Sequence, residues 1–202
     1  MKKNLCIIYL VRHGETDWNL KGIIQGNTDI PLNKNGRIQA KELKKKLAKV
    51  NFDKVYSSDM KRAKETAEII VEGSGLSVDT DVLLRERSFG KFEGKHFSFI
   101  SKFEQDKKFR DKVFHGGYGG VEPIKSIKER IFKFLKNIVK QNINKQVLVV
   151  THGGVIRNFL NEIGFAYNRL LPVGSIANSS YLKIRADGKR YAIDEFSGIE
   201  AG

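Results

Sequence analysis

The sequence contains a single cysteine, three prolines and no low-complexity tract. One cysteine cannot form a disulfide within the chain, and Cys6 lies in the apolar stretch LCII, a setting typical of core packing and of a reducing compartment. The 202 residues are 40% apolar and 30% charged, a balance that argues against disorder and is typical of a globular domain with a sizeable core. We therefore expect one ordered domain, residues 1–202, in the cytoplasm.

Long hydrophobic runs are also lacking. The apolar run near the N-terminus, residues 5–11, is about seven residues long and no small-residue cleavage site follows it. We interpret it as a strand rather than as part of a signal peptide. A helix that crosses a bilayer needs about 20 apolar residues. The sequence therefore predicts no membrane-spanning segment and no membrane partner.

Acidic residues are few relative to basic ones, with 23 Asp and Glu against 37 Lys and Arg, which gives a formal net charge of +14. Such an excess suits an anionic partner such as a nucleic acid, a membrane surface or a phosphorylated metabolite. Most of the excess is lysine scattered at spacings typical of solvated helix faces, as in KELKKKLAK. Because no segment has the composition of a known nucleic-acid-binding module, we expect no nucleic-acid partner.

Short apolar runs alternate with amphipathic segments along most of the chain. This alternation predicts an α/β fold, a three-layer sandwich with a mostly parallel central sheet and helices on both faces. Asp187-Gly188 is a hairpin turn signal, so antiparallel strands are expected to complete the sheet. The predicted strands are residues 5–11, 54–57, 147–151, 175–184 and 190–196, and the predicted helices are residues 33–50, 58–71 and 123–139.

Residues 89–120 depart from this alternation. The segment is rich in aromatic residues and lysine, ends in HGGYGG and has no convincing strand pattern. We interpret it as a small helical insertion with a glycine loop, lying over the carboxyl ends of the strands. Two roles stay open at this point, because such an insertion either forms the wall of a pocket or is a loop without a function.

Two histidines occupy the same position relative to predicted strands. His13 follows residues 5–11 and His152 follows residues 147–151, and each is followed by glycine and then by a predicted helix. Ligands of open parallel sheets bind outside the carboxyl ends of the strands. Both histidines are therefore expected to face one crevice.

Positive groups are predicted at the same crevice. Arg12 adjoins the first histidine, and Arg62 falls in the first turn of a helix that follows another strand. A helix that begins near Gly153 would add backbone N–H groups and its positive dipole end. Each of these residues alone more often has a structural role, but together they indicate a site for phosphate or carboxylate, the anions that paired guanidinium donors fit best.

Five blocks of sequence follow one another across nearly the whole chain: LVRHGETDWN, IIQGNTDIPLNKNG, VYSSDMKRAKETA, LLRERSFGKFEG and VVTHGGVIRNF. In order and spacing they resemble the histidine phosphatase superfamily, also called the phosphoglycerate mutase-like family. The resemblance implies two-step phosphoryl transfer through a phosphohistidine on His13, with no metal and no other cofactor. A neutral imidazole is a competent nucleophile near pH 7, and the transferred group needs stabilisation of its charged oxygens.

The resemblance also assigns the residues that would hold the phosphoryl group. Arg12, Arg62 and His152 match the family's phosphate pocket, and backbone N–H groups near Gly153 are expected additions. Further pocket-lining positions of the family are matched by Asn19, Gln25 and Gly26. For Asn19 and Gln25, hydrogen bonding within a helix or loop is the alternative role.

A leaving alkoxide needs a proton, and Glu86 matches the family's acid. The like-charged phosphate beside it would favour the protonated carboxyl. Once the leaving group has departed, the same carboxylate could deprotonate the water that attacks the phosphohistidine. Asp81 and Glu93 are the nearby alternatives, and Glu93 ranks below Glu86 because it matches a structural turn of the family.

Three functions stay open. The leading one is a phosphomonoesterase acting on small phosphorylated metabolites, because LLRERSFGKFEGK is most similar to the fructose-2,6-bisphosphatase-like and broad-specificity phosphatases. HGG stands at residues 152–154, where the mutases have His-Gly-Asn, and the mutases' paired arginines are lacking. The second is a phosphoglycerate mutase that interconverts 3- and 2-phosphoglycerate. The third is a basic regulatory or binding protein with a vestigial site, against which the complete set of site residues argues.

The chain departs from the family pattern before the last long predicted helix. Glu122, which would correspond to a pocket residue of the family, follows an inserted valine and precedes a proline where serine is usual. Lysine and aromatic side chains of the insertion could bind a second anionic group of the substrate, although solvation is the expected role of most lysines. These candidates are Lys91, Lys95, His96, Lys107, Lys108 and Tyr118. A homodimer formed through edge strands stays open.

Overall fold

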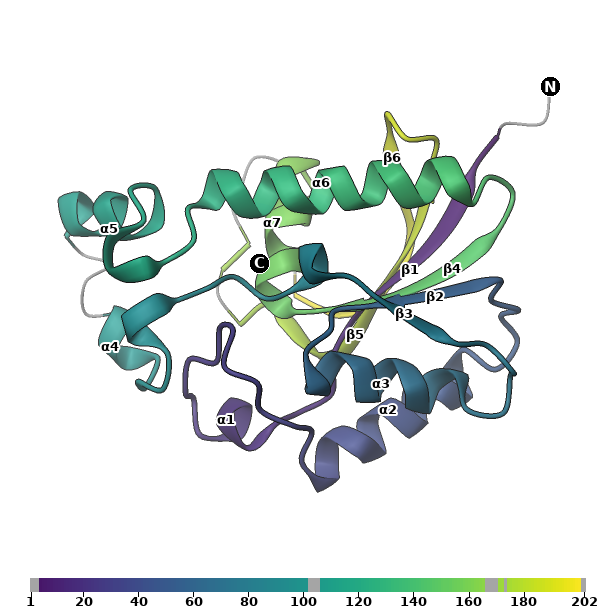
Figure 1. Ribbon diagram of the computed structural model, residues 1–202, viewed down its shortest axis with the longest axis horizontal. Coiled ribbons are helices and arrows are strands. Elements are labelled where there is room, and N and C mark those ends of the chain that lie inside the picture. The colour runs from purple at the N-terminus through teal and green to yellow at the C-terminus, as the bar shows by residue number, and fades with distance from the viewer. Residues whose placement is uncertain (1–3, 102–105, 166–170, 173, 201–202) are drawn as a thin grey trace.

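Six strands form one sheet in the computed structural model, which describes residues 4–101, 106–165, 171–172 and 174–200 (Figure 1). The strands are β1 (Cys6–Arg12), β2 (Lys54–Ser57), β3 (Val78–Thr80), β4 (Gln146–Thr151), β5 (Ile176–Ala186) and β6 (Tyr191–Ile199). Their order is β3-β2-β4-β1-β5-β6. The first four strands in this order are mutually parallel, β5 pairs antiparallel with β1, and β6 pairs antiparallel with β5. The mostly parallel sheet and the hairpin at Asp187-Gly188 are confirmed, whereas the short edge strand β3 was not predicted.

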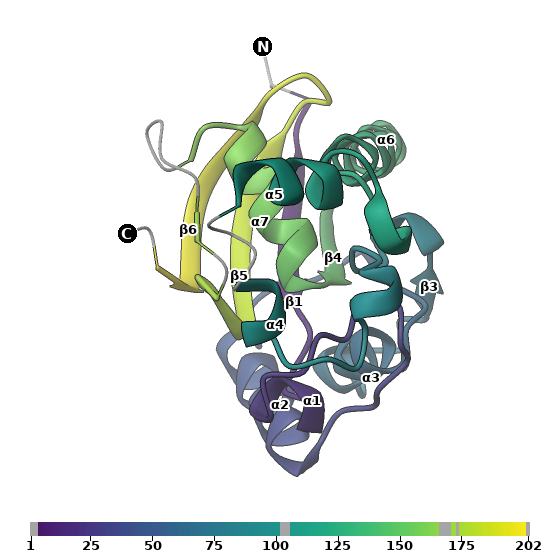
Figure 2. The ribbon, with the colours of Figure 1, turned by 90° about the vertical axis from the view of Figure 1, so that its left-hand side faces the viewer.

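Alternate side chains of the central strands pack under two different layers of helices. The helices of these layers are α2 (Lys34–Lys46), α3 (Lys61–Val71), α6 (Ile124–Gln141) and α7 (Gly153–Glu162). On β1, Ile8 and Leu10 belong to one apolar cluster with α6 and α7, whereas Tyr9 and Val11 belong to another with α2 and α3. The two layers lie on opposite faces of the sheet (Figures 1 and 2). The predicted three-layer α/β sandwich is therefore confirmed.

The helix starts follow capping chemistry with one departure. Asn33 caps α2, because its side-chain oxygen accepts a hydrogen bond of 2.8 Å from the backbone N–H of Gly36. The helix predicted from residue 58 begins only at Lys61, and Met60 takes the N-cap position without a side-chain hydrogen bond. Ser58 thus lies outside the helix, where its hydroxyl is available to the site described below.

The insertion consists of short helices that lie beyond the carboxyl ends of the strands (Figure 1). They are η2 (Gly90–Phe92), α4 (Ser98–Ser101), α5 (Lys107–Phe114) and η3 (Tyr118–Gly120). An apolar cluster of its own, centred on Phe92, Val113 and Val121, joins it to Ile24 of the loop that follows α1 (Asp17–Leu20). The predicted helical insertion over this end of the sheet is confirmed.

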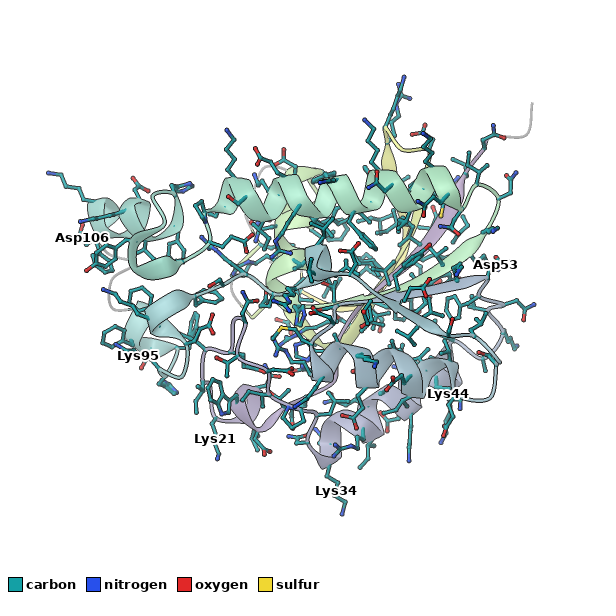
Figure 3. All side chains as sticks on the ribbon, in the orientation of Figure 1. Lys21, Lys34, Lys44, Asp53, Lys95 and Asp106 are labelled. Carbon is teal, nitrogen blue, oxygen red and sulfur yellow. The ribbon has the colours of Figure 1, made fainter. Side chains whose placement is uncertain are left out.

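Lysine side chains extend from the periphery of the molecule. Lys21 and Lys34 are exposed and project away from the ribbon (Figure 3). Across the described ranges, no helix combines the length and the apolar character that crossing a membrane requires.

Candidate active site

His13 lies directly after β1, where the strand leaves the centre of the sheet. Its backbone N–H donates to the carbonyl of Thr151 at the end of β4 (3.0 Å), and its side chain is only 3% exposed. Nδ1 lies 2.7 Å from the carbonyl oxygen of Gly14. Because a carbonyl can only accept, Nδ1 carries the proton and Nε2 keeps a free lone pair. Burial, and then the charges of Arg62 and Arg12, lower the pKa of His13 well below its usual value of 6.5, so the imidazole is neutral at pH 7.

His152 follows β4 and lies beside His13, with the two ring centroids 5.1 Å apart. Its Nε2 is 2.9 Å from the hydroxyl of Ser58. Its Nδ1 is buried and has no hydrogen-bond partner in the part of the chain that the structure describes. Burial is the main cause that lowers the pKa of His152, followed by the charge of Arg62. One ring nitrogen is thus held by protein and the other is left for a ligand.

Two guanidinium groups lie next to the histidines, that of Arg62 fully buried and that of Arg12 half-buried. Arg12 donates through Nη1 to the carbonyl of Ile176, and Arg62 donates through Nη1 and Nη2 to the carbonyls of Thr28 (2.9 Å) and Gly26 (2.8 Å). The Nε atoms of both arginines are buried without a hydrogen-bond partner among the described residues. Burial lowers the pKa of Arg62 to about 10, so its charge persists at pH 7. A buried donor without a partner is costly, so an anion beside these two guanidinium groups would be stabilising.

Glu86 faces the start of α7. Its Oε2 accepts a hydrogen bond from the backbone N–H of Gly154 (3.0 Å), and its Oε1 accepts one from the N–H of Arg87 (2.8 Å). A β-carbon at position 154 would lie 2.4 Å from Oε1 of Glu86. Glycine at this position therefore lets the carboxyl group approach the helix N-terminus.

These groups surround a pocket of about 420 Å³. Of the predicted site residues, the pocket is lined by Arg12, His13, Asn19, Gln25, Gly26, Arg62, Glu86 and Gly153, while His152 is buried beside His13 and is not part of the lining. The remaining wall is mainly apolar and contains Trp18, Ile23, Ile24, Phe89, Phe97 and Ile176. Phe89 and Phe97 come from the insertion, which therefore forms part of the pocket wall. No group of three His, Cys, Asp or Glu side chains is arranged to hold a metal ion within the described ranges.

Asn19, Gln25 and Gly26 line the pocket but differ in their hydrogen bonds to the rest of the protein. Asn19 completes a capping box with Thr16 at the start of α1, so its structural role is present together with its place in the pocket. Gln25 has a buried Oε1 with no partner among the described residues, which leaves an acceptor for a substrate hydroxyl or a protonated phosphate oxygen. Gly26 has φ of +51° and supplies the carbonyl that binds Arg62.

The alternative acidic residues are engaged elsewhere. Glu93 accepts hydrogen bonds from the backbone N–H groups of Asn27 (3.0 Å) and Phe89 (2.9 Å), and so ties the pocket loop to the insertion. Asp81 caps the short helix η1 (Val82–Leu84). Glu122 forms a two-point ion pair with Arg130 at 2.7 and 3.0 Å. None of the three lines the pocket within the described part of the chain.

The insertion lysines are also directed elsewhere. Lys91 lies over the ring of Tyr118 with its Nζ 4.0 Å from the centroid, and Lys95 lies over Phe99 at 4.5 Å. His96 contacts Ser98 through Nδ1. Among the residues described, these side chains do not line the pocket. The side chain of Lys107, another candidate, lies outside the described residues.

Sequence reasoning missed residues that come from non-adjacent segments. Asn178, on an irregular part of β5, donates through Nδ2 to the backbone carbonyl of His13 (3.1 Å), and the N–H of Ser179 reaches the same oxygen (3.3 Å). Ser179 has φ of +55°, a strained value for serine. Arg157, on α7, lines the pocket. A cluster of small polar residues inside an apolar strand, ANSS, was the available signal for the first two.

The buried histidines predict a loss of stability in acid. In the unfolded chain a histidine has a pKa of about 6.5, whereas folding lowers the pKa values of His13 and His152, so the unfolded state binds more protons as the pH falls below that value. Each such histidine should lower the free energy of unfolding by up to about 1.4 kcal/mol per pH unit below pH 6.5. We expect His152→Gln to flatten this dependence by about one proton in denaturant titrations in phosphate-free buffer. His115→Gln, which alters an exposed histidine, is the control, and an unchanged slope in His152→Gln would contradict the assignment.

A model of the histidine phosphatase superfamily (branch 1) matches residues 8–197. The chain belongs to this superfamily. A Bacillus subtilis (strain 168) protein named uncharacterized phosphatase PhoE is 38% identical to it over 156 residues, which are 77% of this chain and 76% of that protein.

Two solved structures are similar to this chain over nearly its whole length. The phosphoserine phosphatase of Entamoeba histolytica, solved with 3-phosphoglyceric acid, is 28% identical, with a TM-score of 0.76, and the match covers 97% of this chain and 98% of that one. A phosphoglycerate mutase from Bacillus anthracis str. Sterne is 26% identical, with a TM-score of 0.83, and the match covers 98% and 94% of the two chains. The predictions of the family, the fold and the phosphatase class are confirmed by these matches, and mutases also occur among the similar proteins.

Proposed function

We propose that this histidine phosphatase hydrolyses small phosphorylated metabolites through a phosphohistidine on His13, without a metal ion. The observation that carries the proposal is the set of polar groups around His13 that have no hydrogen-bond partner among the described residues. His13 has its Nδ1 proton fixed by Gly14, which leaves Nε2 as the nucleophile. Around it, Nε of Arg12, Nε of Arg62 and Nδ1 of His152 are buried without partners among the described residues. These donors suit the oxygens of a phosphoryl group.

In the first step, Nε2 of His13 attacks phosphorus and the bond from phosphorus to the ester oxygen breaks. Glu86 gives its proton to the departing oxygen, so an alcohol rather than an alkoxide leaves. The guanidinium groups offset the charge on the phosphoryl oxygens. In the second step Glu86 takes a proton from water, the resulting hydroxide attacks phosphorus, and the N–P bond breaks to release phosphate and neutral His13.

A phosphoglycerate mutase is the second candidate, because proteins of that name are among the similar structures. Position 154 favours the hydrolase. The residue there is glycine, and any β-carbon would come within 2.4 Å of the Glu86 carboxyl in its observed position. An asparagine, the residue that the family resemblance implies for mutases at this position, would force Glu86 to move.

A panel of phosphorylated metabolites assayed with a chelator present tests the proposal. We expect phosphate release from several small phosphomonoesters at unchanged rates with EDTA. Net conversion of 3-phosphoglycerate to 2-phosphoglycerate, without phosphate release from any ester, would make the protein a mutase. Binding of phosphate without turnover of any ester would instead support the basic binding protein with a vestigial site.

We also propose a cellular location, a domain organisation and an assembly state for the protein. Cys6 is a buried free thiol whose pKa burial raises to about 11, so it is an unreactive core residue. This suits the cytoplasm, where we place the protein. We further propose that residues 1–202 form one domain, and size measurements decide between a monomer and a homodimer.

A further inference from the structure

The irregular part of β5 lies beside the end of β1. In the pairing of β5 with β6 the register shifts between Ile176 and Tyr181, and the four residues between them are ANSS. We propose that Asn178 of this stretch is a positioning residue, which fixes the backbone of His13 so that Nε2 of the imidazole stays unprotonated for its attack on phosphorus. This inference rests on the proposed phosphatase function and adds to it a residue that, among those described, does not line the pocket around His13.

The side-chain nitrogen of Asn178 contacts two oxygen atoms of the site. Nδ2 donates to the backbone carbonyl of His13 (3.1 Å) and lies 3.4 Å from Oδ1 of Asn19. The backbone N–H of Ser179 donates to the same carbonyl of His13 (3.3 Å). Two donors from β5 therefore hold one carbonyl oxygen just past the end of β1. Only the amide nitrogen of the Asn178 side chain can donate to these oxygen atoms.

The other end of the same peptide group is held by α3. The N–H of Gly14 belongs to the peptide group of the His13 carbonyl, and it donates to Oγ1 of Thr66 (3.1 Å). The hydroxyl of Thr66 donates in turn to the backbone carbonyl of Arg62 (2.7 Å). Hydrogen bonds from β5 and from α3 thus fix the plane of this peptide group at both ends.

This peptide group controls which imidazole nitrogen carries the proton. The next carbonyl along the chain, that of Gly14, accepts from Nδ1 of His13 (2.7 Å). A glycine backbone is not restricted by a side chain, and position 14 has no room for one, because a β-carbon there would lie 2.4 Å from the carbonyl oxygen of Gly36. The direction of the Gly14 carbonyl therefore depends on the hydrogen bonds of the peptide group before it. Without Asn178, part of the population should carry the proton on Nε2, which then cannot attack.

The conformation of this stretch of β5 supports a functional role. Ser179 has φ of +55°, and strain of this kind persists only where the surrounding contacts enforce it. At the start of the stretch, the carbonyl of Ile176 accepts a hydrogen bond from Arg12. The same short part of β5 thus holds both Arg12 and His13, the two residues that the phosphoryl transfer uses at the end of β1.

Asn178→Ala tests the role of Asn178. We expect kcat and the rate constant of phosphohistidine formation from p-nitrophenyl phosphate to fall about 5- to 50-fold, since one of the two donors to the carbonyl remains. Affinity for inorganic phosphate should change less than about threefold, because Arg12 and Arg62 keep their own carbonyl partners. In ¹⁵N NMR of the ligand-free protein at neutral pH, Nε2 of His13 should be unprotonated in the wild type and partly protonated in the variant. Asn178→Asp, which replaces the donor by an oxygen atom, should lose at least as much kcat.

Asn142→Ala is the matched control. The amide of Asn142 also donates to a backbone carbonyl, that of Ile138 (2.8 Å), but at the end of α6 and outside the pocket. The control should lower stability without changing kcat or the resonance of Nε2 of His13. Unchanged kcat in Asn178→Ala, an unchanged Nε2 resonance, or an equal loss of kcat in the control would overturn the positioning role. A wild type that hydrolyses no ester would overturn the phosphatase proposal, whereas the NMR comparison, which needs no substrate, would still decide whether Asn178 fixes the imidazole.

Discussion

His13→Ala is expected to lower kcat by about 10⁴-fold or more and to abolish the phosphorylated enzyme. The variant removes the nitrogen that we propose attacks phosphorus, so no partial reaction through His13 remains. The phosphoryl site should persist, because Arg12 and Arg62 are held by backbone carbonyls rather than by His13. Steady-state assays and titration with inorganic phosphate check both parts. Affinity for phosphate should fall far less than kcat does.

His115→Ala is the control for this prediction, since it removes an exposed histidine from the end of α5. It should leave kcat unchanged. If His13→Ala kept more than about a tenth of the wild-type kcat, a different group would have to be the nucleophile.

Glu86→Gln is expected to separate substrates by their leaving groups. For alkyl phosphates, whose alkoxides must be protonated as they depart, the loss in kcat should be about 10²- to 10⁴-fold. For p-nitrophenyl phosphate, whose leaving group is stable without a proton, the loss in phosphohistidine formation should be much smaller. Rapid-mixing measurements of the nitrophenol burst check this, because they isolate the first step from the attack of water, which also needs Glu86.

Asp81→Asn is the matched control, since Asp81 caps η1 and does not line the pocket. It should affect both classes of ester equally. Equal losses on alkyl and aryl esters in Glu86→Gln would contradict the role of Glu86 as the acid.

Strands were predictable where a continuous apolar run in the sequence forms a strand that is buried on both faces of the sheet. The strands β1 and β4 are continuous apolar runs buried on both faces, and each was predicted to within one or two residues. The strand β3 has three residues, two of them polar, at the edge of the sheet, so its pairing with β2 leaves no period in the sequence. The start of α3 was placed three residues early, because Ser58 has the character of an N-cap but lies beside His152 instead.

The site was predictable where residues lie at strand ends and in family motifs. The sequence predicted that His13 and His152 face one crevice, and their ring centroids lie 5.1 Å apart, although only His13 lines the pocket. Glu86, which the family resemblance assigned, lines the same pocket. The sequence did not predict that a residue of β5, far along the chain, would form a hydrogen bond with the backbone of His13. The hydrogen bond from Asn178 to the carbonyl of His13 joins β5 to the end of β1 across 165 positions, and no local pattern encodes such a pairing. Arg157 was hidden by its place in an otherwise amphipathic helix, where an arginine is expected to be solvated.

Trapping the phosphorylated enzyme tests the central proposal most directly. The protein would be mixed with a good substrate, quenched in alkali within milliseconds and analysed by phosphorus NMR and by mass spectrometry of its peptides. Because Nδ1 of His13 is held by the carbonyl of Gly14, we predict a phosphoryl group on Nε2 of His13, stable in alkali and lost in acid. A phosphoryl group on another residue, or its absence while the enzyme turns over under conditions in which water attack limits the rate, would contradict the account.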